Sequence, residues 1–334
     1  MIRWKNVLAV LGMAALPVAV PIAAPTASAA SADNGAVGRL FAGTAQVELG
    51  EHFAGEAVLA GLVGTNAADL RDAIAGETYE HTSMYPGFAA QAVKDNCTVA
   101  ADLFTEIAGD EGDHAAAYTT ALRSLTDPTV KVPVPPKVDP VEITPSGPAC
   151  PGTQTQNNLL DAMHGEAFAY AKYTAYATQA DRTGKSAVER LFAGTAQVEL
   201  REHFAGEAVL AGLVGTDSAN LRDAIAGETY EHTTMYPGFA AQAVKDNCTV
   251  ASDLFTEIAG DEGDHAVAFT TALRSLTDPT VKVPAPPKAD PVEITPSGPA
   301  CPGTQTQNNL LDAMHGEAFA YAKYTAYASQ TDRG

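Results

Sequence analysis

Glutamates recur along this chain at helical spacing, at positions where an amphipathic helix would carry apolar side chains. The pattern occurs twice, since Glu111-Gly-Asp-His114 returns as Glu262-Gly-Asp-His265. Burying several carboxylates together costs many kcal/mol unless a cation neutralises them. Glutamates from facing helices combined with Glu-x-x-His form the pattern of a two-metal carboxylate site inside a four-helix bundle. The candidate metal ligands are Glu48, Glu51, Glu77, Glu80, Glu111, His114, Glu166, Glu199, Glu202, Glu228, Glu231, Glu262, His265 and Glu317.

The N-terminal 29 residues have the pattern of a signal peptide. Arg3 and Lys5 precede an apolar run over 7–24, and Ala27-Ser28-Ala29 is a small-x-small cleavage motif. No other segment is long and apolar enough to span a bilayer. We therefore expect residues 1–29 to be removed and the mature chain to be secreted, with no membrane contact afterwards.

Charge and cysteine spacing exclude several classes of partner and cofactor. The formal net charge is −20, and losing Arg3 and Lys5 makes it −22, because residues 1–29 contain no acidic residue. Such a chain repels nucleic acid and anionic lipid. None of the four cysteines forms a C-x-x-C pair, so the sequence contains no zinc-ribbon or rubredoxin-type iron motif. An even cysteine count in an exported chain favours disulfides.

The mature chain is a tandem repeat. Residues 33–183 and 184–334 align without a gap at an offset of 151 and differ at about 17 positions. The apolar periodicity predicts four helices in each copy, and the fold class is therefore all-α. A Pro-rich linker, over 127–155 in the first copy and 278–306 in the second, precedes the last helix of each copy. In the second copy we expect the helices at about 187–214, 219–244, 250–276 and 308–329.

Three segments resemble the rubrerythrin family of ferritin-like di-iron proteins. Gly227–Pro237 (GETYEHTTMYP) and Glu257–His265 (EIAGDEGDH) resemble that family's third and fourth helices, and Leu159–Tyr173 resembles its first. The resemblance implies two ferritin-like four-helix bundles. The family order is helix A, B, C, D, whereas this chain has the permuted order B-C-D-A-B-C-D-A. The first B-C-D set must therefore borrow a helix A from later in the chain or from another chain.

The short connection between helices B and C predicts an exchange of helices within the chain. In ferritin-like bundles these two helices run parallel, which here requires a connection of about 30 Å. The four or five residues around 215–217 reach only about 15 Å. Bundle one would then comprise residues from about 68 to 214. Bundle two would comprise residues from about 219 to 330 together with the N-terminal helix B.

The exchanged arrangement also predicts the disulfides. The end of helix C and the start of helix A would lie at the same end of a bundle, and each linker is long enough to run down it. We expect the bonds Cys97–Cys150 and Cys248–Cys301. A Cys150–Cys248 bond would instead indicate the unexchanged order.

The resemblance assigns metal ligands to each bundle. Site 1 would use Glu77, Glu80, Glu111, His114, Glu166 and Glu199. Site 2 would use Glu228, Glu231, Glu262, His265, Glu317 and Glu48. Helix B departs from the family's Glu-x-x-His, because Glu199 is followed three residues later by Glu202, and His203 comes one position late. Either Glu202 replaces the histidine, or a local shift brings His203 in. We favour Glu202, and Glu51 in the first copy, because it lies closer to the apolar stripe.

Four tyrosines match positions next to the metals in that family: Tyr173, Tyr324, Tyr85 and Tyr236. A buried phenol beside a carboxylate ligand can orient it or pass a proton or an electron. The alternative is ordinary aromatic core packing. The remaining histidines at positions 81, 164, 232 and 315 lack ligand spacing on the carboxylate stripe, and we expect them not to bind metal.

Carboxylate and imidazole ligands suit iron or manganese. The resemblance implies two iron ions per site, four per chain, and a redox enzyme that reduces hydrogen peroxide or dioxygen. Rubrerythrins usually take electrons through an attached rubredoxin domain, so the electron donor here is unknown. The alternatives are an iron-binding, ferroxidase or sequestration protein, and a structural module. We expect a monomer or a homodimer.

Overall fold

The computed structural model describes residues 34–331, and every regular element within that range is helical. The predicted signal peptide and its cleavage site lie outside the described residues. Among the described helices, none is both long and apolar enough to cross a membrane. The first copy contains α1 (Asn34–Val47), η2 (Glu48–Phe53), α2 (Ala54–Ala60), α3 (Asn66–Tyr79), η3 (Glu80–Met84), α4 (Tyr85–Lys94), α5 (Thr98–Ser124) and α6 (Gln154–Arg182). The second contains α7 (Ser186–Val198), η4 (Glu199–His203), α8 (Phe204–Ala211), α9 (Asp217–Tyr230), η5 (Glu231–Met235), α10 (Tyr236–Lys245), α11 (Thr249–Ser275) and α12 (Gln305–Thr331).

The elements marked η are single π turns within longer helices. Helix B of the first copy is therefore α1–η2–α2, helix C is α3–η3–α4, helix D is α5 and helix A is α6. The second copy repeats this order from α7 to α12. The helix boundaries lie within about three residues of those expected from the apolar periodicity. The π turn η5 divides helix C of the second copy and ends just before Tyr236 at the start of α10.

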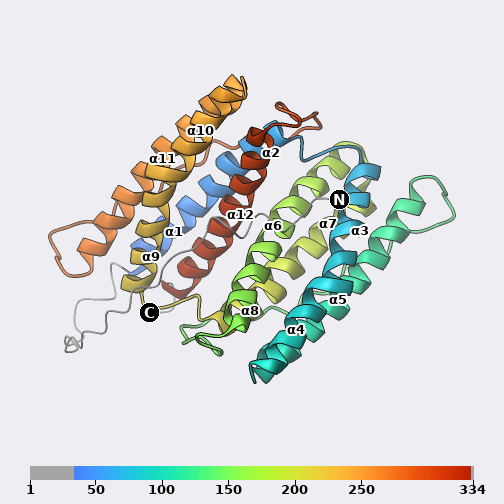
Figure 1. Cartoon of the computed structure of the whole chain (residues 1–334), viewed down its shortest axis with the longest axis horizontal. Helices are drawn as coiled ribbons and strands as arrows, with labels where there is room; N and C mark the ends of the chain where they lie inside the picture. The colour runs from blue at the N-terminus through green and yellow to red at the C-terminus, as the bar shows by residue number, and fades with distance from the viewer. Residues whose placement is uncertain (1–33, 332–334) are drawn as a thin grey trace.

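The helices assemble into two four-helix bundles by exchange within the chain. Bundle one contains α3–α4, α5 and α6 of the first copy with α7–α8 of the second. Bundle two contains α9–α10, α11 and α12 with the N-terminal α1–α2. Figure 1 shows this exchange directly, with the blue α1 lying beside the red α12 and the orange α11. The permuted all-α architecture predicted from the sequence, including its exchange, is confirmed.

A tight turn sends helices B and C of one copy into different bundles. Gly61 ends α2 in the left-handed conformation, with φ of 67°. Thr65 then caps α3 by accepting a hydrogen bond from the amide of Ala68 at 3.3 Å. An added Cβ on Gly61 would lie 2.7 Å from the backbone nitrogen of Pro299. Only glycine fits that conformation and that close approach together.

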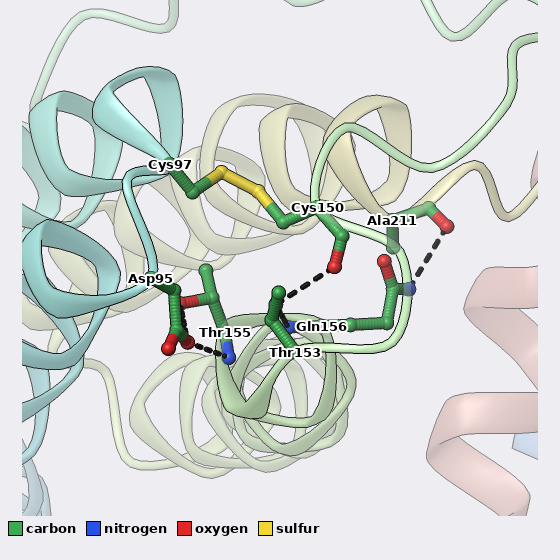
Figure 2. Close-up of a disulfide and its surroundings, with 7 residues drawn as sticks. All are labelled: Asp95, Cys97, Cys150, Thr153, Thr155, Gln156 and Ala211. Atoms are coloured by element: carbon green, nitrogen blue, oxygen red, sulfur yellow. Dashed lines mark hydrogen bonds between the residues drawn. A yellow bond between two sulfur atoms is a disulfide. The ribbon is translucent and has the colours of Figure 1, made fainter.

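Each Pro-rich linker is fixed to a bundle at several points. The disulfides are Cys97–Cys150 and Cys248–Cys301, as predicted. Beside the first disulfide, Asp95 accepts hydrogen bonds from the amide and hydroxyl of Thr155 at the start of α6 (Figure 2). The disulfide thus joins the end of helix C to the residues just before helix A.

The linker also bonds to helix B of its bundle. The amide of Val141 donates to the carbonyl oxygen of Arg201 in η4 at 2.8 Å, and the amide of Ala149 donates to that of Leu210 at 2.8 Å. In bundle two, Val292 donates to Gly50 in the same way. A π turn breaks the regular α-helical bonding. Linker amides therefore donate hydrogen bonds to backbone carbonyl oxygens in η2 and in η4, the π turns of the two B helices.

Removing one disulfide should lower the stability of its bundle. The bond Cys97–Cys150 closes a loop with a sequence separation of 53. Loop-closure entropy then predicts that Cys97→Ser with Cys150→Ser lowers the free energy of unfolding by about 2–4 kcal/mol. Chemical unfolding of the oxidised parent and the double variant measures the difference. A change below about 0.5 kcal/mol would show that the linker's other contacts suffice to hold it.

The two bundles pack against each other through α6 and α12. The rings of Tyr170 and Tyr321 stack with their hydroxyl oxygens 3.1 Å apart. His164 stacks on Phe319 with ring centroids 3.8 Å apart. Burial, followed by the charge of Lys323, lowers the pKa of His164 to about 4, so this ring is neutral at pH 7. These stacked rings form an aromatic layer between the bundles.

Candidate metal centre

The π turns of helix B decide which side chains enter the sites. A π turn has more residues per turn than an α-helix, so residues four apart share a face in it. In η4 this places Nδ1 of His203 2.8 Å from Oε2 of Glu199. The same nitrogen lies 3.1 Å from Oε1 of Glu111 on α5. His52 in η2 has the equivalent position, 2.8 Å from Glu48.

The expectation that Glu202 and Glu51 take the helix B ligand position is therefore corrected. Both are only half-buried and lie outside the carboxylate clusters. Glu51 instead accepts a hydrogen bond from the backbone amide of Asp290 in the linker. The local shift considered as the alternative is what the structure contains, and the π turn is its physical cause.

Site 1 consists of two overlapping groups of ligand atoms, each group within 4.8 Å. All of its members are buried, and they come from α3, α5, α6 and η4. The groups are Glu77, Glu111, His114, Glu199 and Glu111, Glu166, Glu199, His203. Glu111 and Glu199 belong to both, so they have the position of bridging ligands between two metal ions. Each ion would then have one further carboxylate and one imidazole.

Site 2 repeats this arrangement in the other bundle. Its groups are Glu48, Glu228, Glu262, His265 and Glu48, His52, Glu262, Glu317. Glu48 and Glu262 have the bridging position here. Glu48 and His52 come from the N-terminal helix B, more than 170 residues before Glu228 in the sequence. Site 2 therefore exists only because of the exchange between the bundles.

Several donor atoms of site 2 converge without satisfying one another's hydrogen bonds, as expected for atoms that bind metal ions. Nδ1 of His52 lies 2.8 Å from Glu48 and 3.0 Å from Glu262, and Nε2 lies 3.5 Å from Asp261, yet among the described residues none of these contacts has hydrogen-bond geometry. Both carboxylate oxygens of Glu48 and Oε1 of Glu262 also lack partners among the described residues. Buried polar atoms that converge without hydrogen bonds are costly. A pair of cations at their common centres would satisfy them.

Several carboxylates of site 1 have shifted pKa values, and the shifts differ in direction. Burial raises the pKa of Glu166 to about 7, although His203 partly opposes the shift. Burial also acts to raise the pKa of Glu199, but His114 and His203 outweigh it and hold that pKa well below its usual range. Burial also raises the pKa of Glu111, which lies beside His114 and His203, and that of Glu228, which lies beside His265 in site 2. The metal-free site therefore holds protons that metal ions would displace.

Glu80 and Glu231, also expected as ligands, lie outside both groups. Each is the first residue of a π turn, η3 or η5. Oε1 of Glu80 lies 4.0 Å from the place that a Cβ on Gly165 would occupy, and Glu231 has the same relation to Gly316. These carboxylates thus extend over a glycine of helix A, beside the sites, instead of into the ligand groups.

The four predicted tyrosines all hydrogen-bond to site carboxylates. Tyr173 donates to Oε1 of Glu77 at 2.5 Å, and Tyr324 donates to Glu228. Tyr85 donates to Glu166, as Tyr236 does to Glu317. Burial, followed by the nearby carboxylates, raises the pKa of each phenol, so all four remain protonated donors at neutral pH.

Sequence reasoning missed two further pairs of carboxylates. Glu207 and its counterpart Glu56 are fully buried and lie 2.9 Å from the hydroxyls of Tyr85 and Tyr236. Their spacing, eight residues after Glu199 and Glu48, was a signal that could have found them. The second pair is Asp110, 3.4 Å from Nε2 of His203, and Asp261, 3.5 Å from Nε2 of His52, and such contacts orient an imidazole ligand. The histidines at 81, 164, 232 and 315 lie outside the ligand groups.

The helix B assignment can be tested with a matched pair of variants. His203→Ala should weaken metal binding at site 1 by about 10–100-fold or more. It removes a ligand, and it leaves the carboxylates of Glu111 and Glu199 without the imidazole that they contact. Glu202→Ala should change the affinity less than about twofold, since Glu202 lies outside the cluster. Isothermal titration with Fe(II) under argon measures both. Equal losses in the two variants would contradict the assignment.

Fold and site together define a protein with two four-helix bundles, each with a buried cluster of carboxylates and histidines that could hold metal. The family model for rubrerythrin matches residues 33–122 and 195–273. The chain is 32% identical over 143 residues to a rubrerythrin of Porphyromonas gingivalis, which covers 39% of this chain and 71% of the relative. It is 33% identical over 138 residues to nigerythrin of Nitratidesulfovibrio vulgaris, covering 37% and 68%. The chain belongs to the rubrerythrin family. No solved structure matches it significantly.

Proposed function

We propose that this protein is an exported di-iron oxidoreductase that reduces hydrogen peroxide, or alternatively dioxygen, with two iron ions at each site. One observation carries the proposal: in each bundle, two buried ligand groups share two glutamates and have one histidine each. A pair of adjacent metal positions with mixed carboxylate and imidazole ligands suits iron or manganese. Membership of the rubrerythrin family favours iron and a peroxidase reaction.

The side chains around each centre have separate roles in this reaction. Bound iron would supply the electrons and polarise the oxidant. Tyr173 holds Glu77 through its hydroxyl, and Tyr85 holds Glu166, so the terminal carboxylates keep a fixed orientation. Asp110 fixes the ring of His203. The buried surroundings exclude bulk water, which strengthens each of these interactions.

Protons and electrons must both reach the site. Reduction of hydrogen peroxide to two water molecules consumes two protons and two electrons. The fully buried Glu207 beside Tyr85 lies outside the ligand groups, and burial raises its pKa, so it can hold a proton within the bundle. The electrons come from an external donor, whose identity is unknown. We expect a small redox protein or a reduced small molecule in this role.

A direct assay tests the proposal. The mature protein, loaded with Fe(II) under argon, should consume about one hydrogen peroxide per metal pair in a single turnover. Added reductant should then sustain turnover. The control is Glu111→Ala with Glu262→Ala, which removes one bridging ligand from each site. Peroxide consumption that is the same in this control would contradict the proposal.

The second candidate is iron binding with ferroxidation or sequestration, which the net charge of −20 favours because it attracts cations. Iron uptake far beyond four ions per chain in the presence of oxygen would support it. Export is part of the same proposal and rests on the N-terminal segment. Mass spectrometry of the protein recovered from culture medium should find a chain that begins near residue 30.

A further inference from the structure

The two sites differ by one buried hydroxyl group. Tyr118 on α5 corresponds to Phe269 on α11, and both side chains are fully buried. Tyr118 packs against Phe192 and Tyr173, with ring centroids 4.9 Å and 5.4 Å away. Phe269 packs against the equivalent rings of Phe41 and Tyr324 at 5.0 Å and 5.4 Å. The surrounding rings are thus the same in both bundles, and packing alone does not need the hydroxyl.

Tyr118 lies in the layer of the core next to site 1. It follows His114 by four residues, so it shares the buried face of α5 with that residue one turn further on. Thr195, which precedes Glu199 by four residues, is in the same layer on helix B. The ring of Tyr173, which Tyr118 contacts, carries the hydroxyl bonded to Glu77. Tyr118 is therefore separated from the ligands by no more than one helical turn.

The hydroxyl of Tyr118 lies near that of Thr195, close enough for Thr195 to lower the pKa of Tyr118, but neither hydroxyl makes a hydrogen bond of full geometry to any described residue. An unpaired buried hydroxyl is destabilising. The second copy avoids this cost with phenylalanine in the same packing. A hydroxyl that packing does not require, and whose one polar neighbour does not reach hydrogen-bond geometry, is available to a ligand.

We propose that Tyr118 donates a hydrogen bond to the small oxygen ligand, peroxide or water, that enters site 1, and that site 2 lacks this donor. Tyr118 would then be a catalytic residue of site 1 alone. This inference rests on the proposed peroxide reaction. Burial, followed by the charge of Glu77, raises the pKa of Tyr118, so the phenol keeps the proton that it donates. One chain would thus contain two centres with the same ligands but different reactivity.

Single-turnover kinetics with two reciprocal variants test the inference. The Fe(II)-loaded parent should react with hydrogen peroxide in two phases of equal amplitude, differing in rate by on the order of 10²-fold, the low end for a positioned donor. Tyr118→Phe should leave only the slow phase, and Phe269→Tyr only the fast one. A single phase in the parent, or unchanged phases in Tyr118→Phe, would overturn the inference. If no protein consumes peroxide, the proposed function itself fails.

Thermal unfolding of the metal-free proteins gives a readout that does not depend on activity. If the hydroxyl is unpaired, Tyr118→Phe should raise the Tm by about 2–4 °C, and Phe269→Tyr should lower it by a similar amount. Most buried tyrosines would show the opposite sign, because they lose a hydrogen bond on replacement by phenylalanine. An unchanged or lower Tm for Tyr118→Phe would show that Thr195 already pairs with the hydroxyl, and it would overturn the inference.

Discussion

Replacing Glu111 by alanine should remove both metal ions of site 1 and at least half of the peroxide turnover. Glu111 belongs to both ligand groups of the site and is buried on α5. Its loss leaves each metal position with three ligands. It also removes the carboxylate that both His114 and His203 contact. Site 2 lies in the other bundle and should keep its two ions. Metal analysis after gel filtration, together with steady-state peroxide consumption, measures both effects.

The control for this variant is Glu106→Ala on the same helix. Glu106 is exposed and has no place in the ligand groups. It should keep about four metal ions per chain and the parent turnover. If Glu111→Ala also kept its metal, Glu111 would not be a bridging ligand and the assignment of site 1 would be wrong.

The metal-free protein should lose stability as the pH rises from about 5 to 8, the reverse of the usual acid denaturation. Burial raises the pKa of Glu166 to about 7 and that of Glu231 to about 8, from the usual value of 4.5 for a glutamate. Between pH 4.5 and these values the folded state binds more protons than the unfolded state, so stability falls as pH rises. The loss is on the order of several kcal/mol from these two groups.

The raised pKa values of the site histidines act in the same direction. Burial opposes the shift at His203, but the charge of Glu111 and the contact with Asp110 outweigh it, and the extra stability is lost as pH rises through the folded pKa. Metal ions replace these protons, so Fe(II) or Mn(II) should restore stability most strongly near pH 8. Thermal unfolding from pH 5 to 8, with and without metal, measures this. A metal-free Tm that rises over this range would contradict the account.

The architecture could be predicted because it depends on lengths and periodicities. The apolar stripes place each helix, and the connection that includes Gly61 is too short to join parallel helices of one bundle. Together with the parallel helices B and C that the resemblance to ferritin-like bundles implies, these two facts predict the exchange. The cysteine pairing follows from it, because Cys97 and Cys150 then lie at one end of bundle one.

The details of the site depend on local backbone geometry, which the sequence does not reveal. With ordinary α-helical spacing, Glu202 shares a face with Glu199. The π turn η4 replaces it by His203, and the linker amide of Val141, 2.8 Å from the carbonyl oxygen of Arg201, supports that turn from outside. Glu80 lies outside the ligand groups and beside Gly165 of helix A, a placement that helical spacing alone does not reveal.

The most direct test of the account compares metal binding by two double variants of the full mature chain. In the exchanged fold, Glu48 and Glu262 share site 2, whereas Glu48 and Glu111 belong to different sites. Glu48→Ala with Glu262→Ala should therefore keep about two tightly bound Fe(II) ions, and Glu48→Ala with Glu111→Ala should keep none. If the first variant kept none and the second kept two, the helices would not be exchanged and the two centres described above would be wrong.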